Sequence, residues 1–153
     1  MTRYTVNNRN TLLSIPLYVT VLTVTANSCN DNTMYTVDLS SFKFLRSVVI
    51  GNYCFYNVLA FSIVGLNWLE SVSIGYRSFW DSSTSSLKGS EFKIVNCPQL
   101  KSLSIEGCSF FRYNGFELSQ LPQLKSVGIS YNGCFRYARN AVFRGMNDGR
   151  DGL

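Results

Sequence analysis

A recurring order of apolar residues is the feature that most constrains how this chain can fold. The stretch from Leu100 to Leu121 carries large apolar residues at positions 100, 103, 105, 110, 116, 118 and 121, and closely similar orders begin at Leu45, Leu69 and Leu124. The copies that begin at Leu45 and Leu100 are each 24 residues long. A period of this size is typical of repeat proteins, in which each unit covers the apolar side of its neighbour. The sequence therefore predicts a stack of similar coils.

The repeats define a single expected domain over residues 12–146. It holds about five units that start near residues 19, 45, 69, 100 and 124, and the first unit is degenerate. The copy that starts at Leu69 is longer, and its extra residues lie in the interval 80–91, which is rich in serine, threonine and glycine. Such a segment predicts a surface loop, because insertions there are tolerated. Residues 1–11 are predicted to be a loose polar leader and residues 147–153 a polar tail.

Alternation within each unit predicts β structure. The segment Ser71–Gly75 places Val72 and Ile74 on one face and two serines on the other, as a strand does. A second, shorter alternating segment follows in each unit, for example Phe61-Ser62-Ile63. No interval shows the apolar stripe of a long amphipathic helix. We therefore expect a mainly β fold of parallel strands, joined by short helical or 3₁₀ turns.

The amino-acid composition favours a folded domain over a disordered or membrane-spanning chain. Of the 153 residues, 46% are apolar and 15% are charged, which fits one folded domain and not a disordered chain. No apolar run approaches the roughly 20 residues that span a bilayer. The run Leu12–Val24 follows two arginines, as a signal peptide would, but its alternation and Pro16 favour a half-buried strand.

Cysteine usage and charge bear on compartment and partners. The cysteines, at 29, 54, 97, 108 and 134, are odd in number and lack CxxC spacing, so we interpret them as small core residues in a reducing compartment. An intracellular location is therefore favoured, with a secreted or cell-surface location as the alternative. The net charge is +5, and four arginines lie near the C-terminus: Arg136, Arg139, Arg144 and Arg150. They form either a solvated end or a weak site for nucleic acid, anionic lipid or an acidic partner.

Catalytic motifs are missing from the sequence. The chain has no histidine, so a Ser-His-Asp triad is impossible, and Cys134 would lack its usual base. Neither a GxSxG elbow nor a GxxxxGK[ST] or GxGxxG phosphate loop occurs. We therefore expect no enzymatic activity, no cofactor, no metal and no small-molecule substrate.

The repeat resembles a known family. Leu100-x-x-Leu103-x-Ile105-x-x-Cys108-x-Phe110 matches the leucine-rich-repeat consensus LxxLxLxx(N/C)xL, and the copy from Leu124 to Asn132 matches it before a one-residue insertion. Phrases such as FxIxxCPxLKSLxI are similar to the repeats of protist and BspA-like bacterial surface proteins. The resemblance implies a leucine-rich-repeat solenoid that binds proteins or other macromolecules. Tyr53 and Arg77 depart from it, because they occupy the family's asparagine place.

The same pattern nominates binding residues. The most regular predicted surface feature is a row of serines, which either packs well on a curved sheet or gives a partner a hydrogen-bonding floor: Ser47, Ser71, Ser102 and Ser126. Possible anchors lie at its margins, with tyrosine and arginine typical of interface hot spots: Arg46, Glu70, Lys101 and Lys125 on one side, and Tyr76 and Tyr131 on the other. Our hypothesis is a non-catalytic module that binds a protein partner. The alternatives are an extracellular adhesin and, less favoured, a nucleic-acid or anionic-surface binder that uses the basic C-terminal quarter.

Overall fold

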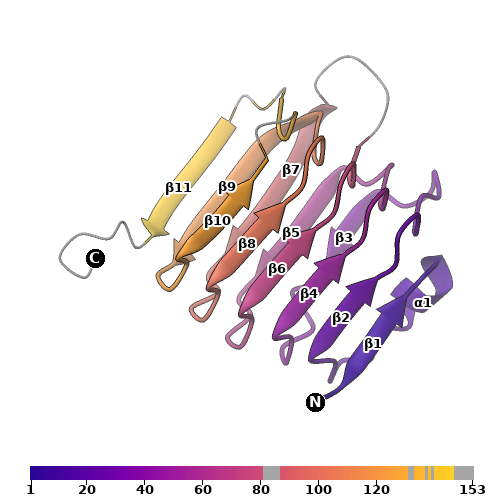
Figure 1. Ribbon diagram of the computed structural model, residues 1–153, viewed down its shortest axis with the longest axis horizontal. Coiled ribbons are helices and arrows are strands. Elements are labelled where there is room, and N and C mark those ends of the chain that lie inside the picture. The colour runs from indigo at the N-terminus through magenta and orange to yellow at the C-terminus, as the bar shows by residue number, and fades with distance from the viewer. Residues whose placement is uncertain (81–86, 131–132, 137, 139, 147–153) are drawn as a thin grey trace.

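Two parallel β-sheets make up nearly all of the regular structure (Figure 1). The computed structural model describes residues 1–80, 87–130, 133–136, 138 and 140–146. The six-stranded sheet, here sheet A, has the order β1-β2-β4-β6-β8-β10, with strands Arg3–Val6, Val21–Val24, Ser47–Ile50, Ser71–Ile74, Ser102–Ile105 and Ser126–Ile129. The five-stranded sheet B has the order β11-β9-β7-β5-β3, with strands Asn140–Met146, Tyr113–Leu121, Leu87–Val95, Ala60–Val64 and Thr36–Asp38. The prediction of a mainly β fold with parallel strands is confirmed.

The register of sheet A follows the sequence repeat. From β2 onward the chain adds one strand to sheet A and then one to sheet B, and it repeats this alternation as far as β11. Val48 pairs with Val72, Val72 with Leu103, and Leu103 with Val127. Equivalent slots of successive copies are therefore neighbours in space.

The core lies between the sheets and contains two columns of phenylalanine rings. The first column comes from sheet B, where Phe61, Phe92 and Phe116 stack with ring centroids 5.5 and 5.4 Å apart. The second comes from the turns that follow sheet A, where Phe79 stacks on Phe110 with centroids 4.5 Å apart. The columns also meet each other, since Phe92 contacts Phe110 edge-on at 4.6 Å. Burial of such rings and their edge-to-face geometry both stabilise the stack.

A ladder of serine and cysteine side chains ties together the turns after sheet A. The Ser78 hydroxyl accepts the backbone N–H of Cys54 at 3.2 Å and donates to the carbonyl of Gly51 at 2.8 Å. Ser109 repeats the arrangement one coil later, because its hydroxyl accepts the N–H of Ser78 and donates to the carbonyl of Gly75. These buried hydroxyls satisfy backbone groups that the sharp turn leaves unpaired.

The turn itself is left-handed at two positions of each coil. Tyr53 and Arg77 have φ of 59° and 53°, and Phe55 and Phe79 have φ of 58° and 56°. Non-glycine residues adopt this conformation at some energetic cost. The serine ladder, the buried rings and the Asn52 side chain, which accepts the N–H of Tyr76 at 2.8 Å, hold these turns.

The structure corrects the prediction for the first residues. Residues 1–11 are not a loose leader, because Arg3–Val6 forms β1, which pairs with β2 in parallel. Val6 is fully buried, while the alternate residues Arg3 and Thr5 are exposed, which explains the polar composition. Helix α1 (Arg9–Leu13) follows, with a capping box formed by Asn8.

Two further expectations about connections were wrong. Part of the predicted loop 80–91 is strand, since β7 begins at Leu87 and pairs with β9 through an irregular register. Residues 81–86 lie outside the described residues. The short helical or 3₁₀ turns between strands are also not observed, because α1 is the only helix in the part of the chain that the structure describes. The predicted tail 147–153 lies outside that part.

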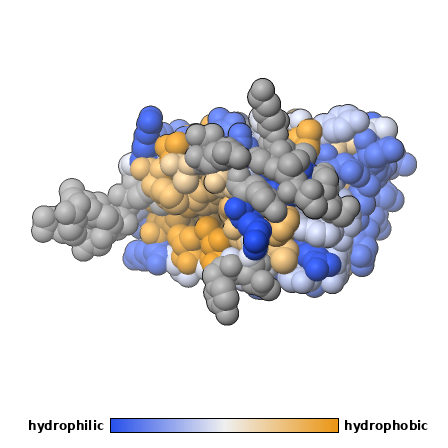
Figure 2. Space-filling model, turned by 90° about the horizontal axis from the view of Figure 1, so that it is seen from above, coloured by the Kyte–Doolittle hydropathy of each residue, from blue (hydrophilic) through white to orange (hydrophobic). Residues whose placement is uncertain are grey.

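The two ends of the stack differ. At one end α1 packs beside β1. At the other end Val127 of β10 and Phe143 of β11 are 48% and 59% exposed, although their register partners Leu103 and Leu118 are buried. Figure 2 shows apolar surface gathered toward this second end of the molecule and hydrophilic surface toward the β1 end.

Candidate interaction surface

The exposed face of sheet A is built from small side chains. Ser47, Ser71, Ser102 and Ser126 lie in one row across β4, β6, β8 and β10, because each is the register partner of the next. Ser71 donates a hydrogen bond to the Ser47 hydroxyl at 3.4 Å. The next row on the same face holds Val49, Ser73, Ser104 and Gly128. We call this surface the serine floor.

Four predicted anchors form one line beside the serine floor. The backbone N–H of Glu70 donates to the carbonyl of Arg46, that of Lys101 to Glu70, and that of Lys125 to Lys101, at 2.8 to 3.0 Å. The four side chains therefore project from successive coils at the start of the sheet A strands. Arg46 and Glu70 approach to 3.8 Å, but both are about half exposed, so this ion pair contributes little to stability.

Three exposed aromatic residues, which were not predicted as anchors from the sequence, also lie along this line. Tyr18, Phe44 and Trp68 each directly precede the first apolar slot of a unit, and they are 65%, 56% and 49% exposed. The Arg46 guanidinium lies 5.6 Å from the centroid of the Trp68 ring. Together Thr20, Phe44, Arg46 and Trp68 line an open hollow of about 270 Å³. The sequence does contain a pattern that could have identified these residues, because an aromatic residue directly precedes the first apolar slot in three units.

We call this edge of sheet A the leading margin. It comprises Tyr18, Thr20, Phe44, Arg46, Trp68, Glu70, Lys101 and Lys125. Its first coils carry the aromatic side chains, whereas the last two carry the lysines, both of which are exposed. The margin thus combines an apolar half with a basic half along one line.

The opposite edge of sheet A, the trailing margin, carries a second aromatic cluster. Tyr76 contacts Tyr53 edge-on at 5.8 Å, and the Arg77 guanidinium lies 5.4 Å from the Tyr76 ring and 4.9 Å from the Trp80 ring. Trp80 in turn contacts Phe111. These side chains are half-buried and contact one another, whereas those of the leading margin are mostly exposed. The predicted anchor Tyr131 lies outside the described residues.

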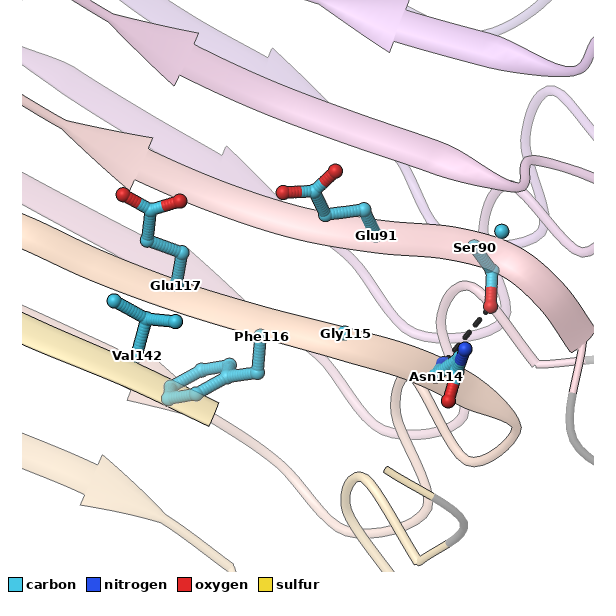
Figure 3. A pocket seen from close by; sticks show the side chains of 8 residues that line it. Ser90, Glu91, Asn114, Gly115, Phe116, Glu117 and Val142 are labelled. Atoms are coloured by element: carbon cyan, nitrogen blue, oxygen red, sulfur yellow. Dashed lines mark hydrogen bonds between the residues drawn. The ribbon is translucent and has the colours of Figure 1, made fainter. Parts of the chain in front are cut away.

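Sheet B carries a hollow of a different character (Figure 3). Its volume is about 240 Å³, and it opens beside Gly115, which adds no side chain next to its register partner Glu91. Both carboxylates that line it are engaged, since Lys93 lies 3.3 Å from Glu91 and the Ser119 hydroxyl donates to Glu117 at 2.6 Å. Among the described residues, no group of three or more histidine, cysteine, aspartate or glutamate side chains is arranged to hold a metal ion.

The cysteines whose pKa is shifted, which are buried except for half-buried Cys134, are held in the thiol form. Burial is the largest cause that raises the pKa of Cys29 to about 12, and the neighbouring Cys54 and Asp31 raise it further. Burial also raises the pKa of Cys97 and Cys134, and the Cys134 thiol donates to the carbonyl of Glu106 at 2.9 Å. A nucleophilic cysteine needs a lowered pKa. The environment of these thiols is therefore that of core residues.

The basic C-terminal quarter is only partly described. Arg136 follows Phe135 in a turn, and Arg144 lies on β11, and both are exposed. Arg139 and Arg150 lie outside the described residues.

In comparisons with known proteins, no family model, no curated protein and no solved structure matches this chain. No helix among the described residues has both the length and the apolar character needed to cross a membrane.

Proposed function

We propose that this protein is a non-catalytic binding module, a leucine-rich-repeat solenoid that binds a protein partner across the exposed face of sheet A. The consensus spacing from Leu100 to Phe110 and the in-register stacking of equivalent slots support the assignment. The turn departs from the family pattern, because Tyr53 and Arg77 occupy the asparagine place and the hydroxyls of Ser78 and Ser109 bond the turning backbone. The serine ladder makes the same kind of connection between coils, from side chain to turning backbone.

The observation that carries the proposal is the aromatic and charged line along the leading margin. Exposed Phe44 and Trp68 flank a hollow with Arg46, and aromatic and arginine side chains supply most of the binding energy at protein interfaces. Apart from Val49, the serine floor beside them presents only serine and glycine, so the partner's backbone can approach the sheet closely. A partner would thereby meet anchors at one edge and a hydrogen-bonding surface next to them.

The test is partner capture with matched aromatic variants. The double variant Phe44→Ala/Trp68→Ala removes both rings of the hollow. The control Tyr35→Ala removes a ring that is 58% exposed just before β3 of sheet B. Proximity labelling in the native cell, with the tag after Leu153, identifies the partners, and quantitative affinity capture then compares the variants.

We expect the double variant to lower the partner's affinity about tenfold or more, since each hot-spot ring contributes about 1–2 kcal/mol or more. The Tyr35→Ala control should capture the partner as the unmodified protein does. Equal capture by all three proteins, with thermal unfolding showing each one folded, would remove the leading margin from the binding site.

A further inference from the structure

We propose that the segment bound at the leading margin is an acidic peptide with one apolar anchor residue, in which the anchor at position i is followed by acidic residues at i+2 and i+4. This inference rests on the proposed function and specifies the partner's chemistry at the same surface.

The charges along the leading margin favour an acidic partner. The leading margin carries three cations, Arg46, Lys101 and Lys125, and one carboxylate, Glu70. Glu70 lies within ion-pair distance of Arg46, whereas neither lysine forms an ion pair with another described residue. The lysines project from adjacent coils, which are about 4.8 Å apart in a sheet. A carboxylate placed between the two ammonium groups would relieve their repulsion and gain two charge-assisted contacts.

The shape of the surface allows a peptide backbone to lie beside the lysines. The basic half of the margin borders the least bulky part of the serine floor, formed by Ser102, Ser126 and Gly128. A Cβ added at Gly128 would meet no atom within 4 Å. A peptide backbone can therefore lie there with its side chains directed at the lysines. At the aromatic half, the hollow between Phe44 and Trp68 has room for one apolar side chain.

The spacing of the coils sets the peptide motif. The hollow is lined from three coils, by Thr20 before β2, Phe44 and Arg46 before β4, and Trp68 before β6, so it is centred on the β4 coil. Lys101 is therefore two coils away and Lys125 three, or about 10 Å and about 14 Å. An extended peptide advances about 3.3 Å per residue, and its side chains at i, i+2 and i+4 point the same way. An anchor at i thus places i+2 and i+4 about 7 Å and about 13 Å along the margin, where the long, flexible side chains of Lys101 and Lys125 can reach them.

Selection from a displayed library of short random peptides tests the motif directly. The purified full chain is the bait, and the Phe44→Ala/Trp68→Ala variant serves for counter-selection. We expect enrichment of peptides with an apolar residue followed by aspartate or glutamate two and four positions later. Enriched peptides without acidic residues at these positions, or no enrichment over the counter-selection, would overturn the inference.

A charge exchange then tests the lysines themselves. Lys101→Glu/Lys125→Glu should weaken binding of the selected acidic peptide at least tenfold, and a peptide with lysines at i+2 and i+4 should regain the affinity. The control Arg9→Glu/Arg144→Glu makes the same change in net charge at exposed positions away from the margin. Equal loss in both proteins would show a general effect of net charge and would contradict the assignment.

The two proposals fail in different ways. If Phe44→Ala/Trp68→Ala abolishes capture of the cellular partner but the lysine exchange leaves capture unchanged, the acidic motif is wrong and the binding face stands. If neither variant changes capture, both proposals are wrong.

Discussion

The hydroxyl of Ser78 is placed to hold two coils together. It is completely buried, and it bridges the N–H of Cys54 and the carbonyl of Gly51 in the preceding coil. The equivalent positions in other coils are Ser109, Cys54 and Cys134, and each of these side chains also donates to a backbone carbonyl. One small hydrogen-bonding side chain per coil therefore holds the turn after each sheet A strand.

Ser78→Ala should lower the free energy of unfolding by about 1–3 kcal/mol, because it leaves a buried N–H and a buried carbonyl unsatisfied. Ser78→Cys should be milder, since the sulfur of Cys54 already fills the equivalent place. Urea denaturation followed by circular dichroism measures both. Equal stability of Ser78→Ala and the unmodified protein would show that the ladder does not stabilise the turns.

The raised pKa of the Cys29 thiol should make the free energy of unfolding depend on pH in the alkaline range. This pKa is raised from 9.0 to about 12 in the folded protein, mainly by burial. The folded state thus keeps the thiol proton where the unfolded state loses it. The contribution is fully present below pH 9.0 and is lost as the pH rises toward about 12. In reducing buffer, Cys29→Ala should show a shallower loss of stability across this range; an identical pH profile would contradict the prediction.

At the scale of the strands, Gly75 and Gly128 can be compared directly. Gly75 directly follows β6, and Gly128 lies within β10. A Cβ added at Gly75 would lie 2.5 Å from the Asn52 side-chain oxygen and 2.6 Å from the Gly51 carbonyl carbon, whereas at Gly128 the space is open. Gly75→Ala should therefore destabilise the protein by about 1–3 kcal/mol, because backbone must move. Gly128→Ala should be neutral or stabilise by up to about 1 kcal/mol. Comparable unfolding midpoints for the two variants would contradict the close packing of adjacent turns.

The sequence predicted the strands of sheet A well because their burial alternates. Val48, Val72 and Leu103 occupy one slot, and this slot is buried between the sheets. The strands were predicted less well where the repeat pattern of apolar residues does not extend. The β7 strand extends back to Leu87 because it pairs with β9, a contact between coils that local composition does not encode. Similarly, β1 has only one fully buried residue, Val6, so its polar sequence hid a strand.

The candidate surface was predicted in part. The sequence placed Arg46, Glu70, Lys101 and Lys125 at one repeat position, and the structure brings them together in one line. It was silent on Phe44 and Trp68, because an aromatic residue beside a leucine slot looks like core until its exposure is known. Tyr131, predicted with Tyr76, lies outside the described residues.

For the whole molecule, the unequal ends of the stack predict a gradient of local stability. In repeat proteins each coil is stabilised by its neighbours, so an end whose inward-facing residues are uncovered opens most easily. Val127 and Phe143 mark such an end. Amide hydrogen exchange should be fastest in β10 and β11 and slowest in β4, β6 and β8. Uniform protection across sheet A would show that the coils unfold as one unit and would contradict the gradient.

The central claim is that a protein partner binds the exposed face of sheet A. Site-specific photocrosslinking in the native cell tests it most directly, with benzoylphenylalanine placed at Ser102 on the serine floor or at Ser62 on the outer face of sheet B. Both positions are half-buried and lie on strands of parallel sheets, which makes them comparable. We predict a specific crosslinked partner from position 102 and none from position 62. The same partner crosslinked only from position 62, or equally from both, would contradict the claim.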